Sequence, residues 1–102
     1  METYAYLQLD ALGDPTRRAI VQLLLQEGPA SVSHIADGFP ISRPAVSQHL
    51  RVLKEAGLVA DEAIGTRRIY HLNPHGFDSL RAYFEQFWSE ALNAFQQKVE
   101  EQ

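Results

Sequence analysis

The chain has 102 residues, carries 9 Lys and Arg against 13 Asp and Glu, and contains no cysteine. This length suits one domain, which we expect to span residues 1–102. The lack of cysteine excludes disulfides, thiolate metal ligands and cysteine nucleophiles. The chain starts without a basic and apolar leader, and no stretch approaches the roughly 18 apolar residues of a membrane span, so we expect a cytoplasmic, soluble protein.

The N-terminal part of the sequence predicts three helices. Residues 3–12 form a short one. Asp14 caps the second, because its carboxylate can accept free backbone N–H groups, and the helical spacing of apolar residues continues until Gly28. Ser31 is expected to cap a short third helix that ends at about Asp37.

A fourth helix is the most regular element of the pattern. Ser42 suits its N-cap, and Gly57 suits a left-handed stop at its end. Only residues 38–41 separate it from the third helix, and two short helices across a tight turn that contains glycine form a helix-turn-helix, with the second as recognition helix. Its apolar stripe is expected to be buried and consists of Val46, Leu50 and Leu53.

A β-hairpin and a long helix are predicted to follow. A strand begins at residues 58–60, the clearest alternating run is residues 66–72, and Gly65 lies in the connection, so the hairpin forms a wing beside the recognition helix. The last helix is amphipathic and extends from Phe77 to about Val99. The predicted fold class is mainly α with a small β-hairpin (α+β), a winged helix-turn-helix.

The fourth helix and the hairpin lie in the segment of the chain that has a positive net charge. Residues 41–72 contain five Lys and Arg against three Asp and Glu, whereas the segments before and after each contain two against five. A basic surface suits a polyphosphate ligand, because Lys and Arg displace condensed counterions. The alternative is an ordinary solvated face.

The outward side of the fourth helix carries groups that can read DNA. Gln pairs bidentately with adenine and Arg with guanine, while the N-terminal end of a recognition helix approaches base edges and phosphates. His49 adjoins the apolar stripe, which favours a packing or phosphate-adjacent role over base readout. The predicted contacts from this helix are Ser42, Arg43, Ser47, Gln48, His49, Arg51 and Lys54.

Two arginines follow the hairpin turn. Alternation along a strand places Arg67 and Arg68 on opposite faces, so we expect one of them to enter the minor groove or to bind phosphate. The alternative is a weak surface salt bridge across the hairpin to Asp61 or Glu62.

The first and last helices carry more apolar surface than a domain of this size can bury by itself. A two-fold dimer would bury them and would present two recognition helices to half-sites about one duplex turn apart. The alternatives are an intrachain core and an aromatic pocket for a small ligand. The predicted dimerisation residues are Tyr4, Leu7, Leu80, Phe84, Phe87, Trp88, Ala91 and Phe95.

Two segments resemble the arsenical-resistance-repressor (ArsR) family of winged helix-turn-helix regulators. They are Asp14-Pro15-Thr16-Arg17-Arg18-Ala19-Ile20 and Ile41-Ser42-Arg43-Pro44-Ala45-Val46-Ser47-Gln48-His49-Leu50-Arg51-Val52-Leu53-Lys54-Glu55-Ala56-Gly57-Leu58-Val59. The resemblance spans roughly residues 7–75. It implies a homodimeric bacterial or archaeal transcription regulator, usually a repressor, whose dimer interface is built from the first and last helices.

The chain departs from the metal-sensing members of that family. Where those members carry Cys-x-Cys, this sequence has Ser31-Val32-Ser33-His34, and hydroxyls do not replace thiolates for a soft metal. The family's other metal site uses Asp and His on the last helix, yet residues 77–102 contain no histidine. The sequence is therefore similar to the metal-independent members, and we expect no metal site and no cofactor.

The leading hypothesis is a dimeric, sequence-specific repressor, with autorepression as one form, that binds double-stranded DNA at a palindromic operator. One alternative is a ligand-gated repressor with an apolar small-molecule effector between the terminal helices. Another is a winged-helix module whose acidic outer surface binds protein. We expect no enzymatic activity, because no nucleophile motif, phosphate-binding glycine loop or metal cluster is present in the sequence.

Overall fold

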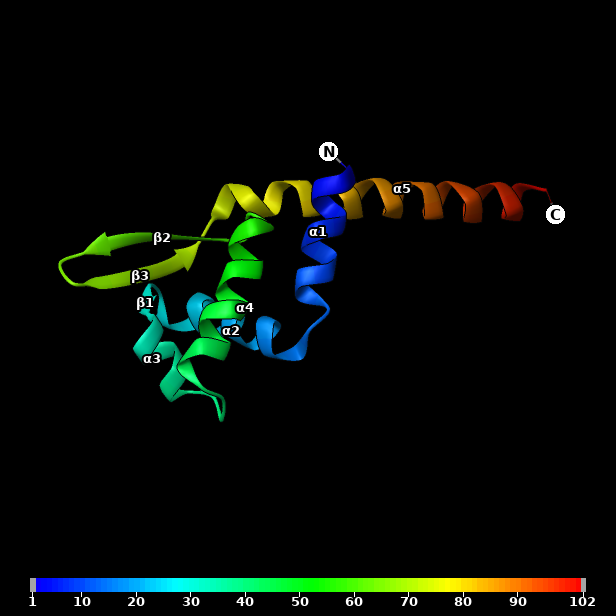
Figure 1. Ribbon diagram of the computed structural model, residues 1–102. Coiled ribbons are helices and arrows are strands. Elements are labelled where there is room, and N and C mark those ends of the chain that lie inside the picture. The colour runs from blue at the N-terminus through cyan, green and yellow to red at the C-terminus, as the bar shows by residue number, and fades with distance from the viewer. Residues whose placement is uncertain (1, 102) are drawn as a thin grey trace.

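The computed structural model describes residues 2–101 and is predominantly helical, with a small antiparallel sheet (Figure 1). The expected arrangement of helices with a β-hairpin wing is confirmed. A two-residue strand and a short 3-10 helix, η1, were not predicted. The elements are α1 (Glu2–Leu12), α2 (Pro15–Glu27), β1 (Ala30–Ser31), α3 (Val32–Asp37), α4 (Arg43–Glu55), β2 (Val59–Ile64), β3 (Arg67–Leu72), η1 (Pro74–Phe77) and α5 (Asp78–Glu100).

Helices α3 and α4 form the predicted helix-turn-helix, and both begin at serine caps. The Ser31 hydroxyl accepts the backbone N–H of His34 at 3.2 Å. The Ser42 hydroxyl accepts the backbone N–H of Ala45 at 3.3 Å. Each cap satisfies a donor that the helix itself cannot pair, so the local sequence determines where the two helices start.

The core lies where α2, α3 and α4 meet the base of the wing. The predicted stripe of α4 is fully buried there, since Val46, Leu50 and Leu53 each have 0% exposure. Ile20 of α2 and Ile35 of α3 are equally buried. This packing orients α4, because a helix with one covered side must present the other side to solvent.

The sheet has the order β1-β3-β2, and both pairings are antiparallel. Ala30 of β1 lies opposite Tyr70, and Val59 of β2 lies opposite Leu72. Gly65 connects β2 to β3 with a φ of 64°, a left-handed conformation that glycine adopts without steric cost. Strand β1 directly precedes α3 and pairs with β3 of the wing, so backbone hydrogen bonds join the helix-turn-helix to the hairpin.

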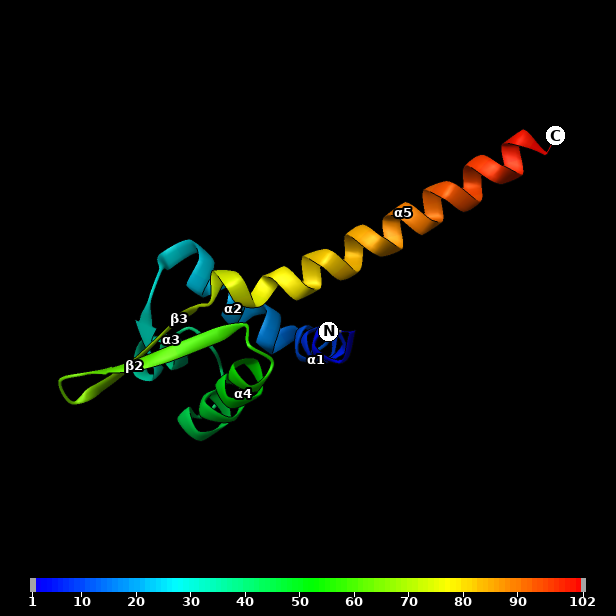
Figure 2. The same ribbon diagram turned by 90° about the horizontal axis from the view of Figure 1, so that it is seen from above.

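Helix α1 crosses α5, and Figures 1 and 2 show the two helices from two directions. Helix α1 does not bury the side on which its larger apolar residue Leu7 lies, since Leu7 is 48% exposed. The buried side instead consists of Ala5, Gln8 and Ala11. The side-chain amide of Gln8 donates hydrogen bonds to the backbone carbonyls of Ala56 and Gly76. A buried amide thus ties α1 to the segments that follow α4 and β3.

Helix α5 extends beyond the rest of the protein (Figure 2). The radius of gyration is 17.4 Å, whereas a compact chain of this length has about 13 Å. Leu80 near its start is buried within the single chain, so the prediction that it lies on a dimer surface is corrected. Every described residue of α5 from Phe84 onward is exposed. In the part of the chain that the structure describes, no helix is long and apolar enough to cross a membrane.

Candidate nucleic-acid interface

The outward side of α4 carries most of the groups that the sequence analysis assigned to it. Ser42 at the N-cap is also exposed, and Pro44 occupies the first turn, where its missing N–H leaves no partner unsatisfied. Polar and basic groups on this side can donate to or accept from base edges and phosphates. The exposed residues predicted to contact DNA are Ser42, Arg43, Ser47, Gln48, Arg51 and Lys54.

His49 occupies a different position from these residues. It is half-buried, and its Nδ1 lies 3.5 Å from the Arg17 guanidinium of α2. Arg17 is itself held by the backbone carbonyl of Ala11, which accepts from its Nε at 2.7 Å. His49 therefore packs at the junction of α2 and α4, and Arg17 is a cation near the recognition helix that the sequence analysis did not assign to the site.

The start of α2 is organised by Asp14. Its carboxylate accepts the backbone N–H groups of Thr16 at 2.8 Å and of Arg17 at 3.1 Å, as the sequence predicts for this cap. The hydrogen bond from the Arg17 backbone, opposed in part by desolvation, lowers the pKa of Asp14 below its ordinary value. The carboxylate is thus kept ionised at the end of the helix where negative charge is favourable.

The wing is connected to α4 by a carboxylate shared between two cations. Asp61 of β2 accepts from Lys54 at 2.8 Å and from Arg68 at 2.8 Å. The Asp61 side chain is only 4% exposed, and the hydrogen bond from Lys54, followed by that from Arg68, lowers its pKa despite the cost of burial. The alternative reading of the wing arginines, a salt bridge across the hairpin, is thereby confirmed for Arg68.

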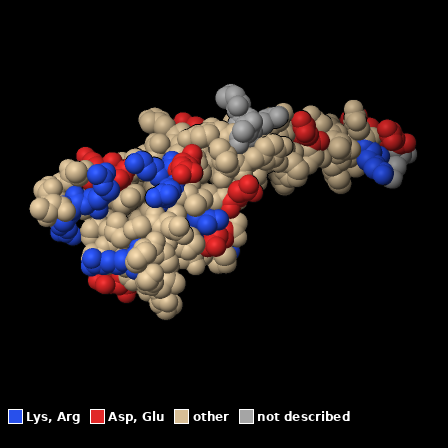
Figure 3. All heavy atoms as spheres, in the orientation of Figure 1, with Lys and Arg blue, Asp and Glu red and all other residues tan. Residues whose placement is uncertain are grey.

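The other wing arginine makes a different contact. Arg67 donates to the Ser31 hydroxyl at 3.2 Å, and Arg43 at the start of α4 donates to the hydroxyl of Ser33. These contacts bring the beginning of α3, the beginning of α4 and the beginning of β3 together. Figure 3 shows most of the Lys and Arg side chains of the visible face over this half of the protein, and few along α5.

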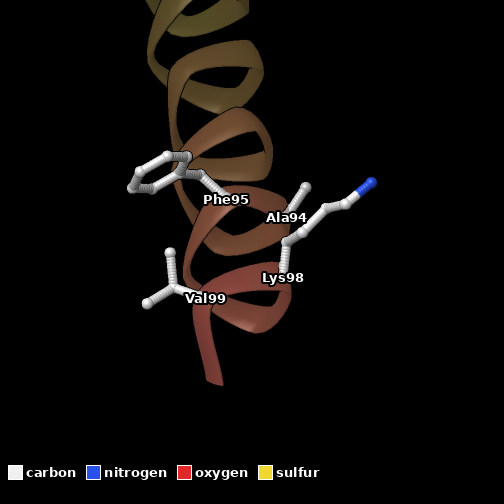
Figure 4. A pocket seen from close by; sticks show the side chains of 4 residues that line it. All are labelled: Ala94, Phe95, Lys98 and Val99. Carbon is white, nitrogen blue, oxygen red and sulfur yellow. The ribbon is translucent and has the colours of Figure 1, made fainter. Parts of the chain in front are cut away.

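The exposed side of α5 forms a continuous apolar stripe. Its exposed fractions include 58% for Phe87, 63% for Trp88 and 69% for Phe95. Figure 4 shows Phe95 and Val99 projecting from the same side of the helix, in a hollow lined by α5 alone. The stripe contains two residues that were not predicted, and its members are Phe84, Phe87, Trp88, Ala91, Leu92, Phe95 and Val99.

The remaining predicted dimerisation residues lie on α1. Tyr4 is 38% exposed, and its hydroxyl lies against Gly57, where an added Cβ would collide with it. Tyr6 was not predicted, and its ring meets that of Tyr83 on α5 edge-on, with centroids 5.8 Å apart. Helix α1 thus packs against α5 and the segment after α4 of the same chain, and Leu7 is exposed.

The histidines do not converge. His34 contacts Glu27 at 2.8 Å, and His75 lies 3.6 Å from Asp78. His71 contacts the backbone carbonyl of Leu72. Among the residues that the structure describes, no group of three or more His, Cys, Asp or Glu side chains is placed to hold a metal ion.

Comparison with known proteins identifies relatives over most of the chain. Residues 12–62 match a family model described as a helix-turn-helix domain. The chain is 51% identical over 90 residues to the HTH-type transcriptional regulator Rv2034 of Mycobacterium tuberculosis, covering 88% of this chain and 83% of that protein. It is 43% identical over 63 residues to the transcriptional repressor SdpR of Bacillus subtilis, covering 62% and 69%.

A solved structure shares the architecture. It is the homodimeric winged helix-turn-helix DNA-binding domain Mb0332 from Mycobacterium bovis, described as a possible ArsR-family transcriptional regulator. The two proteins are 28% identical, with a TM-score of 0.69, and the match covers 86% of this chain and 81% of that one.

Proposed function

Because the chain belongs to the ArsR family of winged helix-turn-helix transcriptional regulators, we propose that it is a homodimeric, sequence-specific repressor that works without a metal. The family consists of DNA-binding regulators, not enzymes. Repression is supported by the relative SdpR, a transcriptional repressor, and dimerisation by the homodimeric Mb0332 domain.

The observation that carries the proposal is the exposed polar side of α4. Its opposite side is fixed in the core by Val46, Leu50 and Leu53, each with 0% exposure, so the outward side cannot rotate inward. Gln48 lies on that side and can pair bidentately with adenine, while Arg51 can pair with guanine or phosphate. The helix therefore presents base-reading groups on a rigid support.

The apolar stripe of α5 supports the dimer. A helix with Phe87, Trp88 and Phe95 more than half exposed leaves a large apolar surface in water, and a second copy would cover it. A two-fold axis would place two α4 helices about one duplex turn apart. We therefore propose a palindromic operator, which one chain alone would recognise weakly.

The test is binding of purified protein to a labelled fragment of its own upstream DNA, compared with a scrambled duplex of equal length. We expect specific binding whose affinity falls by orders of magnitude between about 50 and 200 mM salt, because contacts to phosphates release counterions. Added zinc or chelator should leave the affinity unchanged. Equal binding to both duplexes, with no sequence enriched from random DNA, contradicts the proposal.

A second candidate, ligand gating, is favoured by one observation. A mostly apolar hollow of about 450 Å³ lies between α2 and the segment from the end of β3 to the start of α5, not between the two terminal helices as predicted, and Arg81 is one of its lining residues. Its apolar lining is Val21, Leu25, Leu72, Pro74 and Phe77. An apolar effector bound there would raise the melting temperature and alter operator affinity; a panel of hydrophobic carboxylates that changes neither excludes gating by that ligand class.

A further inference from the structure

A small hollow between the helix-turn-helix and the wing is lined by three arginines. It has a volume of about 190 Å³ and is open to solvent. Helix α3, helix α4 and strand β3 all contribute to it, so it exists only when the wing is docked on the helices. Both wing arginines line it, although alternation along the strand predicted that they lie on opposite faces. Its lining consists of Ser31, Val32, Ser33, Arg43, Arg67 and Arg68.

The positive charge of this hollow is mostly uncompensated. None of the described lining residues is acidic. The side-chain hydrogen bonds that the structure gives Arg43 and Arg67 go to the neutral hydroxyls of Ser33 and Ser31. Arg68 shares the single carboxylate of Asp61 with Lys54, so that one negative charge serves two cations.

The lining is also positioned for an oxyanion. Ser31 is 5% exposed, and its hydroxyl already accepts from Arg67 and from the backbone N–H of His34, which holds the Arg67 guanidinium in place. Arg43 reaches the same hollow from α4. Guanidinium groups present several N–H donors in a planar fork, a geometry that matches the oxygens of phosphate.

We propose that this hollow binds a tetrahedral oxyanion of the phosphate class. The oxyanion is supplied either by a phosphodiester of the DNA backbone or by free inorganic phosphate. The first case rests on the proposed function and places one backbone phosphate between the recognition helix and the wing. In the second case free phosphate competes with the operator for this pocket.

The first arm of the test uses the whole protein without DNA. Inorganic phosphate is titrated at constant ionic strength, and the Arg Nε–H signals are followed by NMR. We expect saturable shifts for Arg43 and Arg67, and a loss of about tenfold to hundredfold in affinity for Arg67→Gln. Arg67→Lys should bind with intermediate affinity, because it keeps the charge but lacks the planar fork. Arg18→Gln, at an exposed position of α2, is the matched control and should bind like the wild type.

The second arm uses operator duplexes in which single phosphates are replaced by neutral methylphosphonates. One position in each half-site should cost as much affinity as Arg67→Gln, and the two changes combined should cost little more than either alone. Saturable binding in either arm supports the pocket and identifies the source of the oxyanion. Two results together would overturn the proposal. The NMR shifts would not saturate with phosphate, and at every DNA position the losses of affinity from the methylphosphonate and from Arg67→Gln would simply add. Wild-type protein that fails to bind any duplex refutes the proposed function and leaves the first arm decisive for the pocket.

Discussion

Lys54, near the end of the recognition helix, and Asp61, in the wing, are joined by a 2.8 Å ion pair although they belong to different elements. Arg68 completes the cluster from the neighbouring strand at 2.8 Å. One carboxylate therefore links the wing to α4, in addition to the backbone pairing of β1 with β3.

Replacing Asp61 by Asn is expected to lower the free energy of unfolding by about 1 kcal/mol, because both cationic partners are more than half exposed and solvent weakens each pair. Chemical denaturation measures this change, and hydrogen exchange in β2 and β3 should increase. Glu62→Gln, on the same strand and exposed, is the control and should be close to neutral. Equal stability of the two variants would show that the cluster does not hold the wing.

The same cluster predicts a dependence of stability on pH. The pKa of Asp61 lies below its ordinary value of 3.8 in the folded protein and returns to about that value on unfolding. The stabilisation is therefore present above that pH and is lost as the pH falls through the folded-state pKa. The difference in unfolding free energy between wild type and Asp61→Asn should be constant near about pH 6 and should shrink below about pH 4. A difference that grows at acid pH would contradict this assignment.

Gln48→Ala is expected to change base preference at one position in each half-site, at a cost of about 1–3 kcal/mol. Selection of bound sequences from random DNA, followed by affinity measurement, gives the result. The matched control is Gln22→Ala, which removes an exposed glutamine from α2. If both variants select the same sequence as wild type, Gln48 does not read a base.

Phe95→Glu is expected to weaken dimerisation by about hundredfold or more, because a two-fold interface contains the changed residue twice and each copy loses a buried aromatic contact. Sedimentation equilibrium measures the dimer dissociation constant. Asn93→Glu adds the same charge on the opposite side of α5 and should leave the constant nearly unchanged. Trp88, the only tryptophan, should also show blue-shifted emission as dimers form. Equal dissociation constants for the two glutamate variants would rule out this stripe as the interface.

Two glycines with similar backbone conformations should respond differently to alanine. Gly57 has a φ of 76° and Gly65 a φ of 64°, so each substitution carries a left-handed strain of about 1–2 kcal/mol. An added Cβ has open space at Gly65, but at Gly57 it would collide with the ring and hydroxyl of Tyr4. Gly57→Ala should therefore be less stable than Gly65→Ala by about a further 1–3 kcal/mol in urea denaturation. Equal losses would mean that Tyr4 moves aside freely.

The sequence by itself determined the features that depend on neighbouring residues. Ser42 caps α4, Gly57 ends it, and the stripe of α4 is buried as predicted, because caps and helical spacing act within one or two turns. The positions of the helices and of the wing followed from the same local signals. The outward side of α4 was predictable because a single apolar stripe left only one side for solvent.

Only the tertiary structure decided which groups from distant segments meet. Gln8 is buried and Leu7 exposed because α1 packs against the carbonyls of Ala56 and Gly76, which lie far along the chain. Two residues were too few for a strand pattern, so β1 was recognisable only through its pairing with β3. Leu80 joined the core of the protomer while the rest of its stripe stayed exposed, because α5 leaves the protein body shortly after that residue. Local periodicity determines which side of an element is apolar, but the packing of the whole chain determines what covers it.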